Sequence, residues 1–211
     1  MHTKLSGRQK WRKPFTNCMS NFGHLAPRSK PMLTLFAAIK PPPSILDKVE
    51  TLQKGVEGVR WSPRENLHIT LGYFGLVSDE FAEILDHELA RSPGTGFDLN
   101  LNGVGVFGGS KPHTLWLGIN PSKALEDLHK HCRRAARRAK VEMESRKYAP
   151  HLSLAYMNRG ISLADLSRYV RRHDKFKSKS FLVDEFSLFS SNPQKSGPNI
   201  YQKEANYPLL G

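Results

Sequence analysis

Residues 66–73 read NLHITLGY, and residues 149–156 read APHLSLAY. The two stretches share one pattern: a histidine, an aliphatic residue, a hydroxyl residue, a leucine, a small residue and a tyrosine. Such alternation of polar and apolar residues is typical of a β-strand with one buried face. Its repetition, in similar surroundings, predicts a chain built from two related lobes.

Polar side chains alternate with apolar ones in both stretches. Because side chains two residues apart in a strand point to the same face, His68 and Thr70 are expected to project together, as are His151 and Ser153. If a pseudo-twofold axis relates the lobes, the two polar faces meet across one cleft. The sequence thus predicts two imidazoles and two hydroxyls around a single volume.

Two histidines that face one substrate can divide the work of acid and base. An imidazole titrates near pH 6.5, so one ring can accept a proton while the other gives a proton to a leaving oxygen. Hydroxyl groups donate hydrogen bonds to phosphate oxygens without adding negative charge. The pattern therefore favours in-line attack at a phosphodiester, with no metal ion or other cofactor. A single histidine in an apolar strand is more often a hydrogen-bonded core residue, and the second copy is what favours catalysis.

Strand and helix patterns alternate from residue 32 onwards. Helices are expected at 44–54, 79–90, 121–140 and 162–173, two of them capped by Ser78 and Ser162. Strands are expected at the two repeated stretches and at 32–39, 97–107, 114–119, 181–191 and 200–209. This order predicts an α+β protein of two related lobes, with the sheets close together and the helices outside.

The formal net charge is +13, which favours a polyanion such as RNA as partner. Residues 1–31 hold seven basic and no acidic residues, so residues 32–211 carry only +6 of that charge. We expect residues 1–31 to be a flexible basic extension and residues 32–211 to be one domain. A transit peptide, or an upstream start codon with Met32 as the true first residue, is an alternative for the extension.

The composition and the cysteine pattern argue against several classes of protein. No run approaches the roughly 18 apolar residues of a membrane span, and no secretory signal is recognisable. Cys18 and Cys132 lie far apart without a CxxC partner, which predicts neither a disulfide framework nor a zinc site. Such cysteine usage fits a reducing compartment, and a cytoplasmic protein is expected.

The two motifs, HITLGY and HLSLAY, resemble the HxT/S signatures of the two-histidine (2H) phosphoesterases. Within that superfamily the chain is most similar to the RNA 2′,3′-cyclic phosphodiesterases, long called 2′-5′ RNA ligases. The likeness extends to LFAAIKPP, VRWSPRENLHITLGYFG, KPHTLWLGI, YAPHLSLA and YQKEANYPL, and so covers roughly residues 33–209. It implies a bilobal fold in which each lobe is an antiparallel sheet with outer helices and the active-site cleft lies between the lobes.

The resemblance also implies roles for the residues of the motifs. His68 matches the proton donor to the leaving group, and His151 matches the proton acceptor that activates water. Thr70 and Ser153 match the hydroxyl residues that hold the phosphate. The implied reaction opens an RNA 2′,3′-cyclic phosphate end to a 2′-phosphomonoester, and some family members join tRNA halves through a 2′-5′ linkage in vitro. No protein partner is implied, and a monomer is expected.

One departure from the family pattern concerns the end of the second motif. Tyr156 stands where members of the family commonly carry arginine, and a tyrosine offers one neutral hydrogen bond instead of a charge. Arg64, Lys147 and Arg159 are candidates to replace that charge. Tyr73 ends the first motif, so the two tyrosines either flank the cleft and contact substrate or pack with a solvated tip.

Other features of the sequence have weaker functional readings. Arg134, Arg137 and Arg138 share one face of a helix; they could follow an RNA backbone or lie on a solvated outer face, and the family architecture favours the latter. His129 and His131 point in different directions on that helix and make a poor metal pair. The glycine-rich residues 103–109 lack the features of a P-loop and are interpreted as a turn, and both Trp61 and Trp116 are expected in the core.

Three functions remain compatible with the sequence. The first is a metal-independent cyclic phosphodiesterase acting on RNA ends. The second keeps the same site but acts on a cyclic nucleotide, an ADP-ribose cyclic phosphate or a 2′-5′ oligonucleotide. The third is a protein that binds RNA ends without turnover.

Overall fold

The computed structural model describes residues 32–91, 94–157 and 160–209. The predicted basic extension at residues 1–31 and the candidate cation Arg159 lie outside the described residues. Within the described ranges, no helix is long and apolar enough to cross a membrane.

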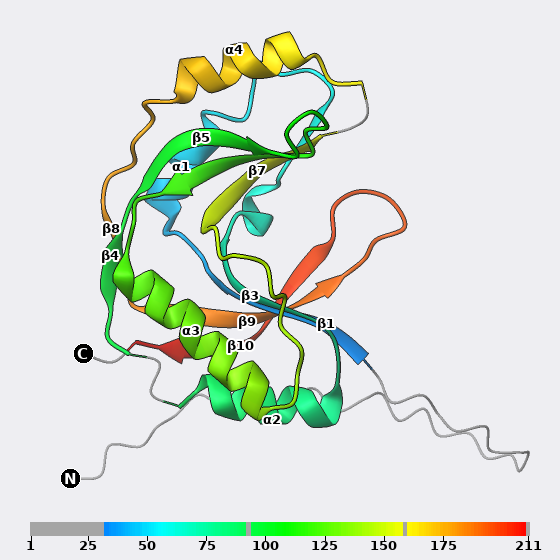
Figure 1. Ribbon diagram of the computed structural model, residues 1–211, viewed down its shortest axis with the longest axis vertical. Coiled ribbons are helices and arrows are strands. Elements are labelled where there is room, and N and C mark those ends of the chain that lie inside the picture. The colour runs from blue at the N-terminus through cyan, green and yellow to red at the C-terminus, as the bar shows by residue number, and fades with distance from the viewer. Residues whose placement is uncertain (1–31, 92–93, 158–159, 210–211) are drawn as a thin grey trace, which may run out of the picture.

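Strands and helices alternate in the predicted order (Figure 1). The first helix is shorter than predicted and ends at Glu50, and the runs at 97–107 and 181–191 are each divided into two strands. Ser162 caps its helix through its side chain, whereas Ser78 occupies the cap position of α2 without a side-chain hydrogen bond. The elements are β1 (Met32–Ile39), α1 (Pro43–Glu50), β2 (Val59–Trp61), the 3₁₀ helix η1 (Arg64–Asn66), β3 (Ile69–Ser78), α2 (Asp79–Leu89), β4 (Phe97–Leu99), β5 (Leu101–Phe107), β6 (Thr114–Ile119), α3 (Lys123–Arg138), β7 (His151–Met157), α4 (Leu163–His173), β8 (Phe181–Val183), β9 (Glu185–Asn192) and β10 (Ile200–Pro208).

The two lobes meet where the two motif strands touch. The main sheet has the order β10-β9-β1-β3-β7-β6-β5, with β2 added beside β7, and neighbouring strands pair antiparallel. Between β3 and β7 only one pair is formed, Ile69 with Leu152. These residues directly follow the two motif histidines, so equivalent positions of the repeat face each other. The pairing therefore supports a pseudo-twofold axis between the lobes.

Helices from both halves of the chain cover each lobe. In Figure 1, α2 and α3 lie beside β1, β3 and β9, whereas α1 and α4 lie with β5 and β7. Hydrogen bonds from His129 of α3 to Leu71 of β3, and from Gln53 just after α1 to Leu154 of β7, tie the helical segments to the motif strands. Each motif strand is thus held by a helical segment that precedes the opposite motif in the chain.

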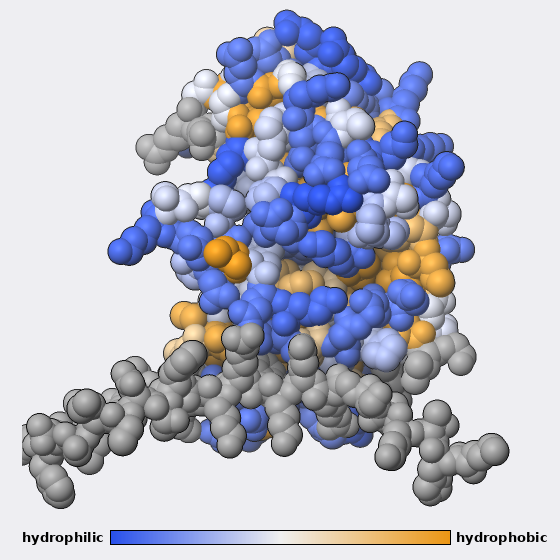
Figure 2. Space-filling view, turned by 180° about the vertical axis from the view of Figure 1, so that it is seen from behind, coloured by the Kyte–Doolittle hydropathy of each residue, from blue (hydrophilic) through white to orange (hydrophobic). Residues whose placement is uncertain are grey.

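One apolar core extends through both lobes. Leu71 and Leu154 are fully buried in it, as is Cys132 of α3, whose thiol is free. Burial of these side chains is the main source of stability, at about 25 cal/mol per Å² of apolar surface. The opposite face of the molecule from that in Figure 1 is mostly hydrophilic, with separate hydrophobic patches (Figure 2). The polar faces of the two motif strands are left facing a cavity.

Candidate active site

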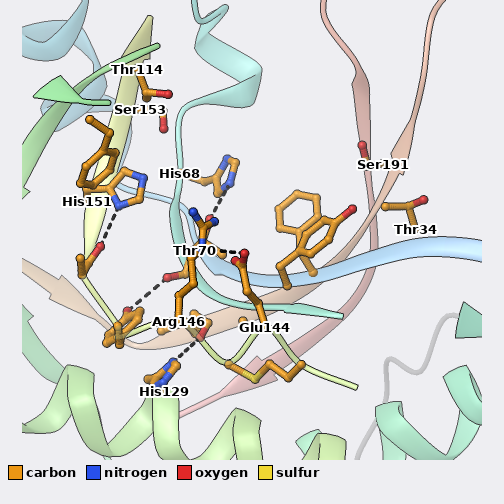
Figure 3. Close-up of a pocket in the computed structure, with 18 of the residues that line it drawn as sticks. Thr34, His68, Thr70, Thr114, His129, Glu144, Arg146, His151, Ser153 and Ser191 are labelled. Carbon is orange, nitrogen blue, oxygen red and sulfur yellow. Dashed lines mark hydrogen bonds and ion pairs between the residues drawn. The ribbon is translucent and has the colours of Figure 1, made fainter. Parts of the chain in front are cut away.

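A cavity of about 770 Å³ lies over the junction of the two motif strands. In the close-up of Figure 3, His68, which directly precedes β3, and His151, the first residue of β7, lie in the upper half of the view, with Arg146 and Glu144 lower down. The six site residues expected from the sequence all line this cavity: His68, Thr70, Tyr73, His151, Ser153 and Tyr156.

His68 is fixed by a hydrogen bond on each side of its ring. Its Nδ1 lies 2.7 Å from the carbonyl oxygen of Asn66, and its Nε2 lies 3.1 Å from Oγ1 of Thr70. Because a carbonyl only accepts, Nδ1 carries a proton and Nε2 of the neutral ring accepts from the Thr70 hydroxyl. Phe36 and Tyr201 pack against the imidazole, with ring centroids 5.0 Å and 5.4 Å away.

His151 repeats this arrangement in the second lobe. Its Nδ1 donates to the carbonyl oxygen of Ala149 at 2.7 Å, again two residues upstream. Phe107 meets the ring edge to face, with centroids 4.8 Å apart. In both histidines the same carbonyl position sets the tautomer, so Nε2 is the nitrogen that can exchange a proton with a substrate.

The surroundings of both imidazoles favour the neutral form. Burial lowers the pKa of His68 to about 4, an effect that the Asn66 carbonyl opposes and that the charges of Lys40 and His151 reinforce. Burial likewise lowers the pKa of His151, with Arg146 adding to the effect. A bound phosphate would oppose both shifts, because its negative charge stabilises an imidazolium.

A β-bulge occurs at the same place in both motifs. Ala38 pairs with Thr70 and Ala37 with Gly72, which leaves Leu71 as the extra residue in β3. In β7 the extra residue is Leu154, since Trp116 pairs with Ser153 and Leu115 with Ala155. A bulge shifts the alternation of side chains by one residue.

The bulges place the motif tyrosines on the face that lines the cavity. With strict alternation Gly72 and Ala155 would follow the hydroxyl residues on that face. Instead, Tyr73 and Tyr156 line the cavity and are 46% and 40% exposed. A six-residue motif therefore presents histidine, hydroxyl and tyrosine together.

The carbonyl groups at and beside the bulges are satisfied from outside the strands. Leu71 accepts a hydrogen bond from Nδ1 of His129 at 2.7 Å, and Thr70 accepts one from the Tyr148 hydroxyl at 3.1 Å. The rings of His129 and Tyr148 stack, with centroids 3.9 Å apart and planes within 6°. In the other lobe, Gln53 donates to the Leu154 carbonyl at 3.2 Å. His129 thus holds the motif strand, a role that the sequence did not reveal.

The cations near the cavity differ from the set considered from sequence. Lys147 lines the cavity, as does Arg146, which pairs with Glu144 at 2.7 Å. Arg64 does not line it, because two carboxylates, Asp47 and Glu50, hold its guanidinium elsewhere. Arg64 is therefore held away from the cavity, unlike Lys147 and Arg146.

Tyr156 has a cationic neighbour of its own. The guanidinium of Arg60 lies 5.6 Å from the centre of the Tyr156 ring, within the range of a cation–π contact. Arg60 faces Tyr156 across the β2–β7 pair.

Several lining residues come from segments without a recognisable motif. Thr114 lies near Ser153 in Figure 3 and contacts Nδ1 of His113 through its hydroxyl at 2.9 Å. Ser191 lies near Thr34 on the other side of the cavity (Figure 3). Only the folding of distant strands brings these side chains together, so no local pattern could have identified them.

Two further interpretations from the sequence need adjustment. Residues 103–107 belong to β5, so only Gly108 and Gly109 of this stretch lie in the turn, which continues to Lys111. Gly105 permits a close approach: a Cβ there would lie 2.2 Å from Trp116. Trp116 is partly buried beside His151, with ring centroids 6.5 Å apart, and not in the central core. Among the described residues, no three His, Cys, Asp or Glu side chains are grouped so as to hold a metal ion.

Two lobes related by a repeated strand, each presenting a histidine and a hydroxyl to one cavity, define a 2H phosphoesterase fold. Residues 41–194 match the model of the 2′-5′ RNA ligase superfamily. The chain belongs to this superfamily, which confirms the resemblance drawn from the motifs.

Named relatives are similar over most of the chain. A protein of Archaeoglobus fulgidus named RNA 2′,3′-cyclic phosphodiesterase is 29% identical over 178 residues, which cover 81% of this chain and 97% of the relative. A protein of Escherichia coli with the same name is 30% identical over 129 residues, 61% and 68% of the two chains. The crystal structure of E. coli LigT complexed with 3′-AMP superposes with a TM-score of 0.71 at 25% identity, covering 86% of this chain and all of that one.

Proposed function

We propose that this protein hydrolyses RNA 2′,3′-cyclic phosphate ends to 2′-phosphomonoesters by metal-independent acid–base catalysis. One observation carries the proposal: each histidine is anchored through Nδ1 to a carbonyl two residues upstream, which makes Nε2 the nitrogen that can transfer a proton. The names of the relatives agree with this reaction.

In the proposed step, water attacks phosphorus opposite the 3′-oxygen. Nε2 of His151 accepts a proton from the water as its oxygen bonds to phosphorus. The bond from phosphorus to the 3′-oxygen breaks, and Nε2 of His68 gives its proton to that oxygen. The phosphate stays on the 2′-oxygen, and proton exchange with solvent restores both rings.

In this scheme, binding of the substrate favours the protonated form of His68. Burial lowers the pKa of His68 to about 4, which favours the neutral imidazole. The negative phosphate raises that pKa when it binds, so protonated His68 is stabilised only with substrate present. Thr70 and Ser153 then donate hydrogen bonds to the phosphate oxygens, and Arg146 and Lys147 lie close enough in the cavity lining to offset its charge.

One copy of the chain supplies every residue used in this mechanism, which supports action as a monomer. The free thiol of Cys132 is buried and burial raises its pKa to about 12, so the thiol is unreactive. A free cysteine of this kind is compatible with the reducing environment of the cytoplasm, where we propose that the protein acts.

The test is hydrolysis of a short RNA that ends in a 2′,3′-cyclic phosphate, in excess EDTA, with the product isomer identified. The proposal predicts a 2′-phosphate product. A 3′-phosphate product, or activity that EDTA removes, would contradict it. Turnover of a cyclic mononucleotide or ADP-ribose cyclic phosphate but not of RNA would favour the second function, and tight binding without turnover would favour the third.

A further inference from the structure

A second hollow, of about 560 Å³, lies between α3 and the segment that follows it. Four of its lining residues are basic and the others are apolar. The lining consists of Lys130, Arg133, Arg134, Ala136, Arg137, Val141 and Met143. We refer to it as the α3 groove.

The arginines of the α3 groove have no acidic partners. Among the described residues, no ion pair or side-chain hydrogen bond involves Arg133, Arg134 or Arg137. Lys130 has only a long contact with Asp127, at 3.4 Å. Arg138, by contrast, turns away to Glu88 at 3.3 Å and does not line the groove. The helix therefore presents a strip of uncompensated positive charge.

The α3 groove adjoins the catalytic cavity. Met143 lines both hollows, and it lies directly against Gly72 of the first motif. His129, one residue before Lys130, also lines the catalytic cavity. The shared residue Met143 therefore places the groove next to the cavity.

We propose that the α3 groove binds the sugar-phosphate backbone of the RNA strand upstream of the cyclic phosphate. The proposal rests on the proposed function and extends it from the terminal phosphate to the body of the substrate. The site would thus distinguish an RNA end from a cyclic mononucleotide, which has no upstream phosphates.

The chemistry and size of the groove fit this ligand. Guanidinium groups bind phosphate oxygens through paired hydrogen bonds and are more weakly hydrated than ammonium groups. The basic residues recur at i, i+3, i+4 and i+7, a strip of about 10 Å along the helix. A solvated helix face would be convex, whereas these side chains surround a hollow with an apolar wall.

The experiment compares two substrates with one groove variant. In the full chain, Arg133, Arg134 and Arg137 are replaced together (R133Q/R134Q/R137Q). KM for an oligoribonucleotide ending in a 2′,3′-cyclic phosphate should rise about tenfold or more at low salt. The slope of log KM against log salt concentration should fall by about 2, since each single-strand phosphate contact contributes about 0.7. The kinetics with a nucleoside 2′,3′-cyclic phosphate should be unchanged.

The matched control removes three arginines from α4 (R168Q/R171Q/R172Q), which changes the net charge equally. Arg168 and Arg171 are held by Asp165 and Ser167, so these positions are structured but distant from the groove. The proposal predicts wild-type kinetics with both substrates for this control. An equal rise of KM for the oligoribonucleotide in the α3 and α4 variants would show that only net charge matters and would overturn the proposal. An unchanged KM in the α3 variant would also overturn it.

Direct binding separates this proposal from the proposed function. Fluorescence anisotropy with a labelled RNA carrying a 3′-phosphate needs no turnover. Salt-dependent binding that the α3 variant loses and the α4 variant keeps supports the groove even if the wild-type protein hydrolyses nothing. Equal binding by all three proteins overturns it even if hydrolysis proceeds.

Discussion

The hydroxyl of Tyr148 donates a hydrogen bond to the main-chain carbonyl of Thr70, at 3.1 Å. Tyr148 immediately precedes Ala149, whose carbonyl orients His151, while the Thr70 hydroxyl contacts Nε2 of His68. One hydrogen bond therefore ties the segment that orients the second histidine to the strand that carries the first. Tyr148 is a positioning residue in this account.

Replacing Tyr148 with phenylalanine should lower kcat about fivefold with KM nearly unchanged. The loss of one hydrogen bond, worth about 1 kcal/mol, loosens the alignment of the two imidazoles without removing a phosphate contact. Steady-state kinetics with the cyclic-phosphate RNA measure kcat and KM separately and so test this expectation.

Tyr169 provides a matched control. Its hydroxyl donates to the Leu52 carbonyl at 2.6 Å, remote from the cavity. Tyr169→Phe should lose similar stability in urea unfolding and keep its kcat. If both variants lost kcat equally, the effect of Tyr148 would be one of stability alone.

His129 should be required for activity because it satisfies the carbonyl of Leu71 at the bulge. His129→Leu leaves that buried carbonyl without its donor, at a cost of about 1–3 kcal/mol, and should also lower kcat. His129→Asn should recover much of the activity, since its amide nitrogen stands close to the position of Nδ1.

His131 on the same helix tests whether the effect is specific. It makes the same type of bond, from Nε2 to the Leu89 carbonyl at 2.9 Å, outside the cavity. His131→Leu should destabilise the protein while kcat of the folded enzyme stays near wild type. Equal losses of kcat in the His129 and His131 variants would refute a positioning role for His129.

The dependence of kcat/KM on pH should reach its maximum below about pH 6.5. Both histidine pKa values are lowered in the free protein, that of His68 to about 4. As pH rises above both values, the protonated acid becomes scarcer, and kcat/KM should fall about tenfold per pH unit. The maximum of kcat should lie at a higher pH than that of kcat/KM, because bound phosphate raises the imidazole pKa values. A flat kcat/KM from pH 5 to 8 would argue against a two-histidine site.

Arg146 should influence this profile through its charge. Its guanidinium helps to lower the pKa of His151, so Arg146→Gln should raise that pKa and move the limb assigned to His151 to higher pH. Arg91→Gln removes the same charge from an exposed arginine that pairs with the buried Glu88, outside the cavity, and should leave the profile in place. A shift of the same size in both variants would show that only net charge matters.

Much of the fold follows from patterns that are local in the sequence. Alternation identifies the strands, and the doubled motif predicts the cavity because His68 and His151 need only the i, i+2 rule to share a face with their hydroxyl partners. That rule fails beyond Thr70 and Ser153, because each bulge depends on register with a neighbouring strand. The position of the tyrosines on the face that lines the cavity therefore required the structure.

Contacts between segments that are distant in the chain also could not be predicted from the sequence. Arg64 is close to a motif in the chain, but carboxylates of α1 capture it. His129 is remote from both motifs in the chain, yet it bonds to the first motif strand. Distance along the chain is a poor guide to such partners, since they are selected by how helices pack on the sheet.

The central claim is the division of labour between His68 as acid and His151 as base. The most direct measurement is kcat/KM of His68→Ala and His151→Ala on a nucleoside 2′,3′-cyclic phosphate whose bridging 3′-oxygen is replaced by sulfur. A thiolate leaves without a proton, because thiols are far more acidic than alcohols. The account predicts that His68→Ala regains near wild-type rates on the sulfur substrate and that His151→Ala stays inactive on both substrates. Rescue of His151→Ala but not of His68→Ala would contradict it.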